Sequence, residues 1–419
     1  MPLDADVLII GAGPSGSLAA ANLLRRGHSV LIVEREKFPR FSIGESLLPQ
    51  TMGLLEEAGL LRAVVESGFQ HKNGAVFERG HERTEFDFRD KSTSGWGTTY
   101  QVQRAAFDKA LADGVEQAGA RILYRHEITG AQVDGDAARL DLRDADGKAL
   151  RLQGRFVLDA SGNAKVLARL LKLERPSGFP MRQAVFTHVG DNIPRTGGFD
   201  RNKILITVHP EHKDVWYWLI PFSNGRCSLG VVASSVFLAP YEGDLDAGLK
   251  ELQFQAPGLK TLLKDALWDT PARQIKGYSS DVSSLYGPNF ALLGNAGEFL
   301  DPVFSSGVTI AFKSAALAAE LLHRRFTGVA VDWEAEYSKT LRRGVDCFRE
   351  FVEAWYQGTF QDIIFHGKHD PHIRRMICSI LAGYAWDPLN PYVADPRRLR
   401  TLAGICAPNG PFAEAGKQP

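Results

Sequence analysis

The sequence lacks the features that mark several common classes of protein. Its 419 residues carry 49 Lys and Arg against 49 Asp and Glu, and the zero net charge argues against nucleic acid as a main partner. No apolar run approaches the roughly 20 residues that span a bilayer, and the apolar start at Val7–Ile10 is too short for a signal peptide. The sequence therefore predicts a cytoplasmic globular protein without a membrane span.

Cysteine is also scarce, and its placement excludes further classes. The four cysteines are scattered without the spacing of a metal site, and they are Cys227, Cys347, Cys378 and Cys406. We therefore expect no metal, and we expect reduced, mostly buried thiols of the kind found in cytosolic proteins.

What the sequence does contain is a dinucleotide fingerprint near its start. A buried strand at 6–10 is followed by G-x-G-x-x-G at 11–16, by a helix, and by a second strand that ends at Glu34. In such a motif Gly11 allows the sharp turn, Gly13 lets the backbone approach a pyrophosphate, and Gly16 lets helix and strand pack closely. Glu34 would accept a hydrogen bond from a ribose hydroxyl. The motif alone does not separate FAD from NAD.

The rest of the chain divides into segments of different pattern. We expect an α/β fold in which residues 1–180 and 275–330 form a discontinuous Rossmann-type domain. Short β-type runs predict an inserted antiparallel sheet, the substrate lobe, at 181–274. Residues 331–409 are predicted to be helical and 410–419 disordered. The aromatic residues between Phe348 and Ile364 indicate a packed helix face rather than a ligand surface.

The order of the motifs resembles the FAD-dependent monooxygenase superfamily. Arg104 precedes a helix, Asp159-Ala160-Ser161-Gly162 ends a strand, and Gly294-Asn295 follows another. The resemblance implies FAD and a fold like that of p-hydroxybenzoate hydroxylase. Where the superfamily usually has Gly-Asp, this chain has Gly294-Asn295, and an amide can bind a ribityl hydroxyl but lacks the charge.

Within the superfamily, three stretches resemble the flavin-dependent halogenases. They are Gly44-Glu45-Ser46 with Pro49, the W-x-W-x-I-P run at 216–221, and the F-x-x-P-x-x-S-x-G run at 299–307. The fingerprint and the resemblance together predict the following cofactor-binding residues: Gly11, Gly13, Ser15, Gly16, Glu34, Arg35, Ser46, Arg104, Asp159, Gly294, Asn295, Pro302, Gly307 and Val308.

The resemblance also implies a set of catalytic residues. In the family, reduced FAD and oxygen form a C4a-hydroperoxide that oxidises chloride or bromide to hypohalous acid. Lys72 stands where the family has its active-site lysine and would carry the electrophile; the alternative is a solvated surface lysine. Trp216 and Trp218 share one strand face and would wall off the flavin, or be core aromatics. Ser305 would bind halide or orient the peroxide, or cap a helix.

Substrate and partners are implied more coarsely. The tryptophan-specific branch has Glu where this chain has Phe304, so we expect a phenol- or pyrrole-like aromatic substrate, free or tethered to an acyl carrier. No second nucleotide fingerprint is present, which favours FAD reduced by a separate flavin reductase. Two alternatives stay open: an FAD-dependent hydroxylase, dehydrogenase or double-bond reductase acting on an aryl or polyene substrate, and a flavin-binding partner protein without turnover.

Overall fold

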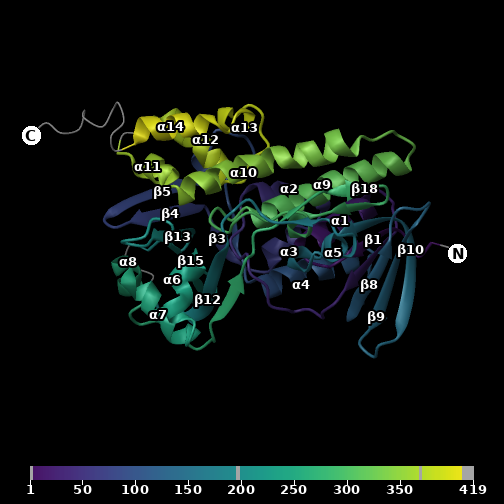
Figure 1. The fold of residues 1–419 in the computed structure, drawn as a ribbon, viewed down its shortest axis with the longest axis horizontal. Coiled ribbons are helices and arrows are strands. Elements are labelled where there is room, and N and C mark those ends of the chain that lie inside the picture. The colour runs from purple at the N-terminus through teal and green to yellow at the C-terminus, as the bar shows by residue number, and fades with distance from the viewer. Residues whose placement is uncertain (1–2, 195–198, 368–369, 408–419) are drawn as a thin grey trace, which may run out of the picture.

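Two mixed β-sheets, joined and covered by helices, make up the protein (Figure 1). The computed structural model describes residues 3–194, 199–367 and 370–407. The predicted disordered tail at 410–419 lies outside the described residues. Within them, no helix is long and apolar enough to cross a membrane.

The first sheet is built around the predicted dinucleotide unit. Its eight strands follow the order β18-β19-β10-β1-β2-β7, and β9 and β8 extend antiparallel from β10. The central pairs, β10 with β1, β1 with β2 and β2 with β7, are parallel. The bounds are β1 Ala5–Ile10, β2 Val30–Glu34, β7 Arg121–Tyr124, β8 His126–Gln132, β9 Ala138–Asp144, β10 Ala149–Asp159, β18 Tyr286–Gly287 and β19 Phe290–Leu292. Parallel strands joined by helices are buried on both faces, as their apolar runs predict.

Helices from distant parts of the sequence pack against this sheet or against one another beside it. They are α1 Pro14–Arg25, α2 Gln50–Ala58, α3 Leu61–Glu66, α4 Arg104–Gln117, α5 Val166–Leu170 and α9 Gly307–Phe326. Helices α1 and α9 lie against each other. Helix α9 is rich in alanine, whose small side chain permits close approach of the two helices. The starts of both helices consequently reach the same region of the molecule.

The second sheet contains the short β-type runs that were expected to form an inserted sheet at 181–274. Its strand order is β16-β12-β15-β14-β13-β4-β5, with bounds β16 Arg273–Lys276, β12 Arg182–Gly190, β15 Arg226–Ser234, β14 Trp216–Pro221, β13 Lys203–Val208, β4 Gly74–Arg79 and β5 Glu82–Asp87. All pairs are antiparallel except β13 with β4, so the sheet is mixed where a wholly antiparallel one was expected. Strands β4 and β5 come from residues assigned above to the Rossmann-type domain. They join this sheet through parallel pairing of β4 with β13 and antiparallel pairing of β5 with β4.

The two faces of the second sheet have different neighbours. Tyr217 and Leu229 belong to an apolar cluster with α7 Leu245–Gln255 and α8 Pro257–Leu262, close to α6 Ser235–Leu238. Because side chains alternate along a strand, Trp216 and Trp218 point to the opposite face. That face joins the main core and turns toward the first sheet.

Two small ladders and a group of helices complete the fold. The ladders pair β3 Gln70–Lys72 with β6 Thr99–Gln101 and β11 Glu174–Arg175 with β17 Asp281–Val282. The remaining helices are α10 Thr340–Tyr356, α11 Thr359–Phe365, α12 Pro371–Leu381, α13 Pro391–Ala394 and α14 Arg398–Cys406. Helix α10 lies along α9, α11 lies over β5, and α13 and α14 pack on α10 and α11 (Figure 1). The aromatic side chains of Phe348, Phe351, Trp355 and Phe360 are buried, in agreement with a packed helix face.

Candidate active site

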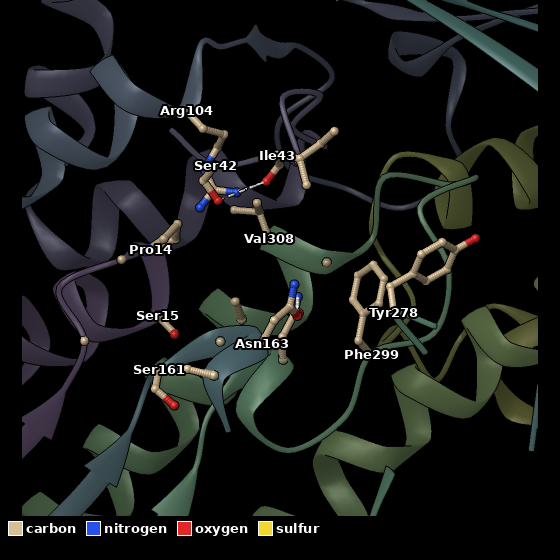
Figure 2. A pocket seen from close by; sticks show the side chains of 18 of the residues that line it. Pro14, Ser15, Ser42, Ile43, Arg104, Ser161, Asn163, Tyr278, Phe299 and Val308 are labelled. Carbon is tan, nitrogen blue, oxygen red and sulfur yellow. Dashed lines mark hydrogen bonds between the residues drawn. The ribbon is translucent and has the colours of Figure 1, made fainter. Parts of the chain in front are cut away.

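A cavity of about 460 Å³ is lined by both sheets and by the starts of α1 and α9. Figure 2 shows Pro14 and Ser15 on one side of it and Phe299 and Tyr278 on the other. Of the predicted cofactor residues, these line the cavity: Gly11, Gly13, Ser15, Glu34, Arg35, Ser46, Arg104, Asn295, Pro302, Gly307 and Val308. The dispersed motifs of the sequence therefore meet at one place.

The glycine turn has the backbone geometry of a phosphate cradle. Gly11 has φ +95°, and a Cβ there would lie 2.7 Å from the carbonyl oxygen of Ala160. A Cβ on Gly16 would lie 1.9 Å from the carbonyl oxygen of Gly11. Helix α1 begins after Gly13 without a side-chain cap, so its first N–H groups are available to an anion. These features fit the pyrophosphate of FAD.

Charged side chains beside the cradle form a linked group. Glu34 accepts hydrogen bonds from the N–H groups of Ala12 and Glu36, both at 2.9 Å. Arg104 makes two hydrogen bonds to Asp108, at 2.7 and 3.0 Å, and a third to the carbonyl of Ile43 at 2.5 Å (Figure 2).

Sequence reasoning missed two members of this group. Arg40 lines the cavity and lies 3.3 Å from Asp108 and 3.9 Å from Glu34. Asp108 is buried and positions both arginines. The i, i+4 spacing of Arg104 and Asp108 was the available signal, whereas nothing in the sequence indicated that Arg40 would join them.

Three predicted cofactor residues do not line the cavity but shape its walls. Gly16 and Gly294 permit close packing, since a Cβ on Gly294 would lie 2.8 Å from that of Ala311. Asp159 is fully buried, and its carboxylate accepts hydrogen bonds from the N–H groups of Ser161 and Leu167 at 2.9 and 2.7 Å. It therefore holds the 161–167 loop instead of facing a ligand. Asn295 does line the cavity, and its amide donates to Asn163 at 3.1 Å (Figure 2).

The two indoles of W-x-W-x-I-P form part of the cavity wall. Trp216 and Trp218 are buried, their ring centroids are 5.9 Å apart, and both line the cavity. Trp218 donates to the Ser228 hydroxyl at 3.0 Å, and its ring lies against Gly230, where a Cβ would approach to 2.2 Å. The two readings of these residues are compatible, because the indoles are core aromatics whose face borders the cavity.

A buried hydrogen-bond network fixes Trp216 from behind. Its indole donates to the Tyr356 hydroxyl at 3.1 Å, and Tyr356 donates to Asp301 at 2.7 Å. Tyr278, which lines the cavity, also donates to Asp301, at 3.0 Å. Burial raises the pKa of Tyr356 well above its usual value, which keeps this phenol a donor at neutral pH. The network was not predicted from the sequence.

Tyr356→Phe is expected to destabilise the protein by about 1–3 kcal/mol, because it leaves the buried Trp216 N–H without an acceptor. Urea unfolding measures the loss. Tyr124→Phe is the control, since its hydroxyl donates only to the exposed Glu116, at 3.2 Å. Equal losses in the two variants would contradict a role for the phenol in holding the indole.

Lys72 is fully buried, so it is not a solvated surface lysine. Its Nζ donates to Ser46 Oγ at 2.6 Å and to the carbonyl of Leu47 at 2.8 Å, and it lies 5.2 Å from the ring centroid of Phe88. Burial lowers the pKa of Lys72 to about 7, and no charged group of the described residues contributes to the shift. Lys72 does not line the cavity, whereas Ser46 does.

The lowered pKa of Lys72 predicts a specific pH dependence of stability. Between pH 7 and 10.5 the unfolded chain holds a proton on this amine that the folded chain has lost. Folding stability from this group therefore rises with pH across that window. We expect the melting temperature of the wild type, relative to Lys72→Met, to increase from pH 7 to pH 10. The exposed Lys264, changed in the same way, should show no such trend, and a falling difference for Lys72→Met would contradict the sign.

Ser305 also faces the cavity, in a strained conformation. Its φ is +56°, and its hydroxyl donates to Ser46 Oγ at 3.0 Å. The alternative role as a helix cap is wrong, since Ser306 is the residue that precedes α9 and no side chain caps that helix. Gly307 and Val308, the first residues of α9, line the cavity, and the helix start has no capping side chain, a setting that favours an anion.

A second pair of titratable groups at the cavity wall was not predicted. Glu45 of the Gly-Glu-Ser stretch is buried and lines the cavity, and it lies 2.7 Å from Nε2 of His188 on β12. The two residues are 143 positions apart, so no local sequence pattern indicated that they would pair.

The comparisons with known proteins agree with this geometry. A family model described as FAD binding domain matches residues 4–232. A tryptophan 2-halogenase of Chondromyces crocatus is 30% identical over 86% of this chain, which spans 66% of that relative's length. A chlorinase of Pseudomonas fluorescens acts on 1H-pyrrole-2-carbonyl-[peptidyl-carrier protein] and is 26% identical, over 94% of this chain and 92% of the relative.

The chain belongs to the flavin-dependent halogenase family. A solved structure described as a flavoprotein/dehydrogenase, from Cytophaga hutchinsonii, is 41% identical with a TM-score of 0.92 and covers 96% of this chain and 98% of its own. The predicted family, the Rossmann-type FAD-binding fold and the class of FAD-dependent oxidoreductases are thereby confirmed.

Proposed function

We propose that this member of the flavin-dependent halogenase family uses externally reduced FAD, oxygen, and chloride or bromide to make hypohalous acid and halogenate an electron-rich aromatic. The observation that carries the proposal is the buried Lys72, whose Nζ hydrogen-bonds to the cavity residue Ser46 at 2.6 Å. A buried lysine with a lowered pKa, hydrogen-bonded to a cavity residue, suits proton transfer.

The chain's own residues divide the work. The glycine cradle, the start of α1 and Glu34 hold the dinucleotide, and reduced FAD supplies the electrons that activate oxygen. The uncapped start of α9 with Ser305 binds halide at the cavity. Trp216 and Trp218 separate an organic substrate from the flavin, so the substrate reacts with hypohalous acid and not with the flavin itself.

The substrate class follows from what surrounds Phe304. A phenylalanine side chain offers no carboxylate to an arenium intermediate. Its ring packs within 6.2 Å, centroid to centroid, of Phe351, Trp355 and Phe360. A phenol or pyrrole activates its own ring and needs no such group. Tethering of the substrate to an acyl carrier is supported by the chlorinase relative. The single dinucleotide fingerprint among the motifs favours reduced FAD from a separate flavin reductase, although many monooxygenases also have only one.

A second function is favoured by one observation. The 41% identical structure is described as a flavoprotein/dehydrogenase. An FAD-dependent dehydrogenase, hydroxylase or double-bond reductase would use the same FAD cradle and would need an organic substrate at the flavin. In that case the indoles would contact the substrate instead of excluding it.

One incubation separates these functions. The FAD-loaded protein is mixed with a flavin reductase, NADH, oxygen and bromide, with monochlorodimedone or a phenol as trap and a carrier-tethered pyrrole as second substrate. Brominated product supports the halogenase. Product that is only oxygenated, dehydrogenated or reduced supports the second function. Absence of flavin reduction and of oxygen consumption indicates a binding partner without turnover.

A further inference from the structure

Lys72 and the flavin cavity are connected through one side chain. The cavity is lined by Ser46 and Ser305, while Lys72 lies behind Ser46 without exposed surface. Ser46 Oγ is 2.6 Å from Lys72 Nζ and 3.0 Å from Ser305 Oγ. An ammonium in this position does not touch a molecule in the cavity directly. Any effect of Lys72 on that molecule passes through Ser46.

The direction of the hydrogen bonds determines what Ser46 can do. A serine hydroxyl has two lone pairs and one proton. Ser46 Oγ accepts one hydrogen bond from Lys72 and another from Ser305, so both lone pairs are occupied. Its own proton remains free to be donated into the cavity that it lines.

We propose that Ser46 relays a proton from the Lys72 ammonium to an oxygen anion in the flavin cavity, a step that rests on the proposed function and names its proton donor. An N–H bond of Lys72 breaks as an O–H bond forms at Ser46, while the original O–H bond of Ser46 breaks and a new O–H bond forms on the anion. The anion is the inner oxygen of the peroxide, which is left as an alkoxide when the O–O bond breaks and halide takes the outer OH to form hypohalous acid. Lys72 becomes a neutral amine, and Ser46 regains a hydroxyl.

Proton transfer in the reverse direction restores the Lys72 ammonium. A neutral Lys72 has a lone pair, so the Ser46 hydroxyl can donate to it while still accepting from Ser305. Water that reaches the cavity then returns a proton by the same two transfers and leaves the cavity as hydroxide. Burial brings the pKa of Lys72 to about 7, so the amine can lose and regain a proton near neutral pH.

Backbone pairing with β6 places Lys72 beside Ser46. Ser46 forms a β-bridge with Gln101 of β6, and Lys72 pairs with Thr99 of the same strand. Lys72 therefore reaches Ser46 across β6, and its second bond, to the Leu47 carbonyl, fixes the Nζ. The groups around Lys72 in these contacts are Ser46, Leu47, Phe88 and Thr99, and all are uncharged. The Ser46 hydroxyl is the side-chain acceptor of a hydrogen bond from the amine.

The test compares Ser46→Ala, Ser46→Thr and Ser305→Ala in the FAD-loaded protein. NMR of ¹³Cε-labelled lysine reports the pKa of Lys72. Ser46→Ala removes an acceptor of the charged form, so we expect this pKa to fall by about one unit. Ser46→Thr keeps the hydroxyl and should restore it, and Ser305→Ala should leave it unchanged because Ser46 still accepts from Lys72.

Halogenation provides the second readout. In the wild type the rate should fall as the pH rises through the pKa of Lys72, because the ammonium is the donor. In Ser46→Ala this pH dependence should disappear. The rate should also fall by about 10²–10⁴-fold, which is the typical contribution of general acid catalysis. Ser46→Ala with the wild-type rate, or with an unchanged pKa of Lys72, would overturn the relay. A wild type that makes no halogenated product contradicts the proposed function, and the pKa response alone then decides for or against the Lys72–Ser46 link.

Discussion

Lys72→Met is expected to lower the rate of halogenation by about 10²–10⁴-fold while FAD stays bound. Methionine has similar length and fills the buried site, but it offers no proton to Ser46. The FAD-cradle residues lie elsewhere, so reduced flavin should still consume oxygen. Halogenated product is measured by mass spectrometry and oxygen uptake with an electrode, in the presence of a flavin reductase and bromide.

Lys203→Met is the matched control for this loss. Lys203 is also a buried lysine, on β13, where it lies 2.7 Å from Asp200, and it does not line the cavity. We expect it to keep most of the halogenating activity. An equal loss in both variants would mean that any buried lysine is needed for folding, and full activity of Lys72→Met would remove Lys72 from the mechanism.

Gly16→Ala is expected to weaken FAD binding by at least about 100-fold, or about 2.8 kcal/mol. The added methyl group would lie 1.9 Å from the carbonyl oxygen of Gly11 and 3.2 Å from the Cβ of Ala160. Helix α1 must therefore shift away from the turn, and its first N–H groups move with it. Flavin fluorescence during titration of the FAD-free protein measures the affinity.

The same substitution in another helix shows whether position matters. Gly404 lies in α14, and a Cβ there meets nothing within 4 Å. Gly404→Ala should bind FAD like the wild type, because alanine is accepted well in an open helix position. Normal affinity in Gly16→Ala would show that the turn tolerates a Cβ and that the described cradle is not the FAD site.

Much of the fold was predictable because its signals are local. The strand, glycine turn, helix and second strand around Gly11 predicted the core of the first sheet, and the β-type runs of 184–232 predicted four strands of the second. The position of β4 and β5 was not predictable. Pairing of β4 with β13 joins residues about 130 positions apart, and no pattern within β4 specifies its partner.

The sequence pointed to residues that lie together but not to their connections. Trp216, Trp218, Ser46 and Ser305 all line one cavity, while the roles assigned to them stay predictions. That Lys72 reaches the cavity through Ser46 depends on how β3, β6 and residue 46 align, which sequence spacing does not encode. The same holds for the network of Trp216, Tyr356 and Asp301, whose members come from three distant segments.

The most direct test of the account is a crystal structure of the protein soaked with FAD and bromide, with anomalous scattering to locate the bromide. We predict the flavin ring in the cavity bordered by Trp216 and Trp218, a bromide peak beside Ser305 at the start of α9, and Lys72 behind Ser46. A flavin ring outside this cavity, or a bromide peak away from the start of α9, would contradict the account.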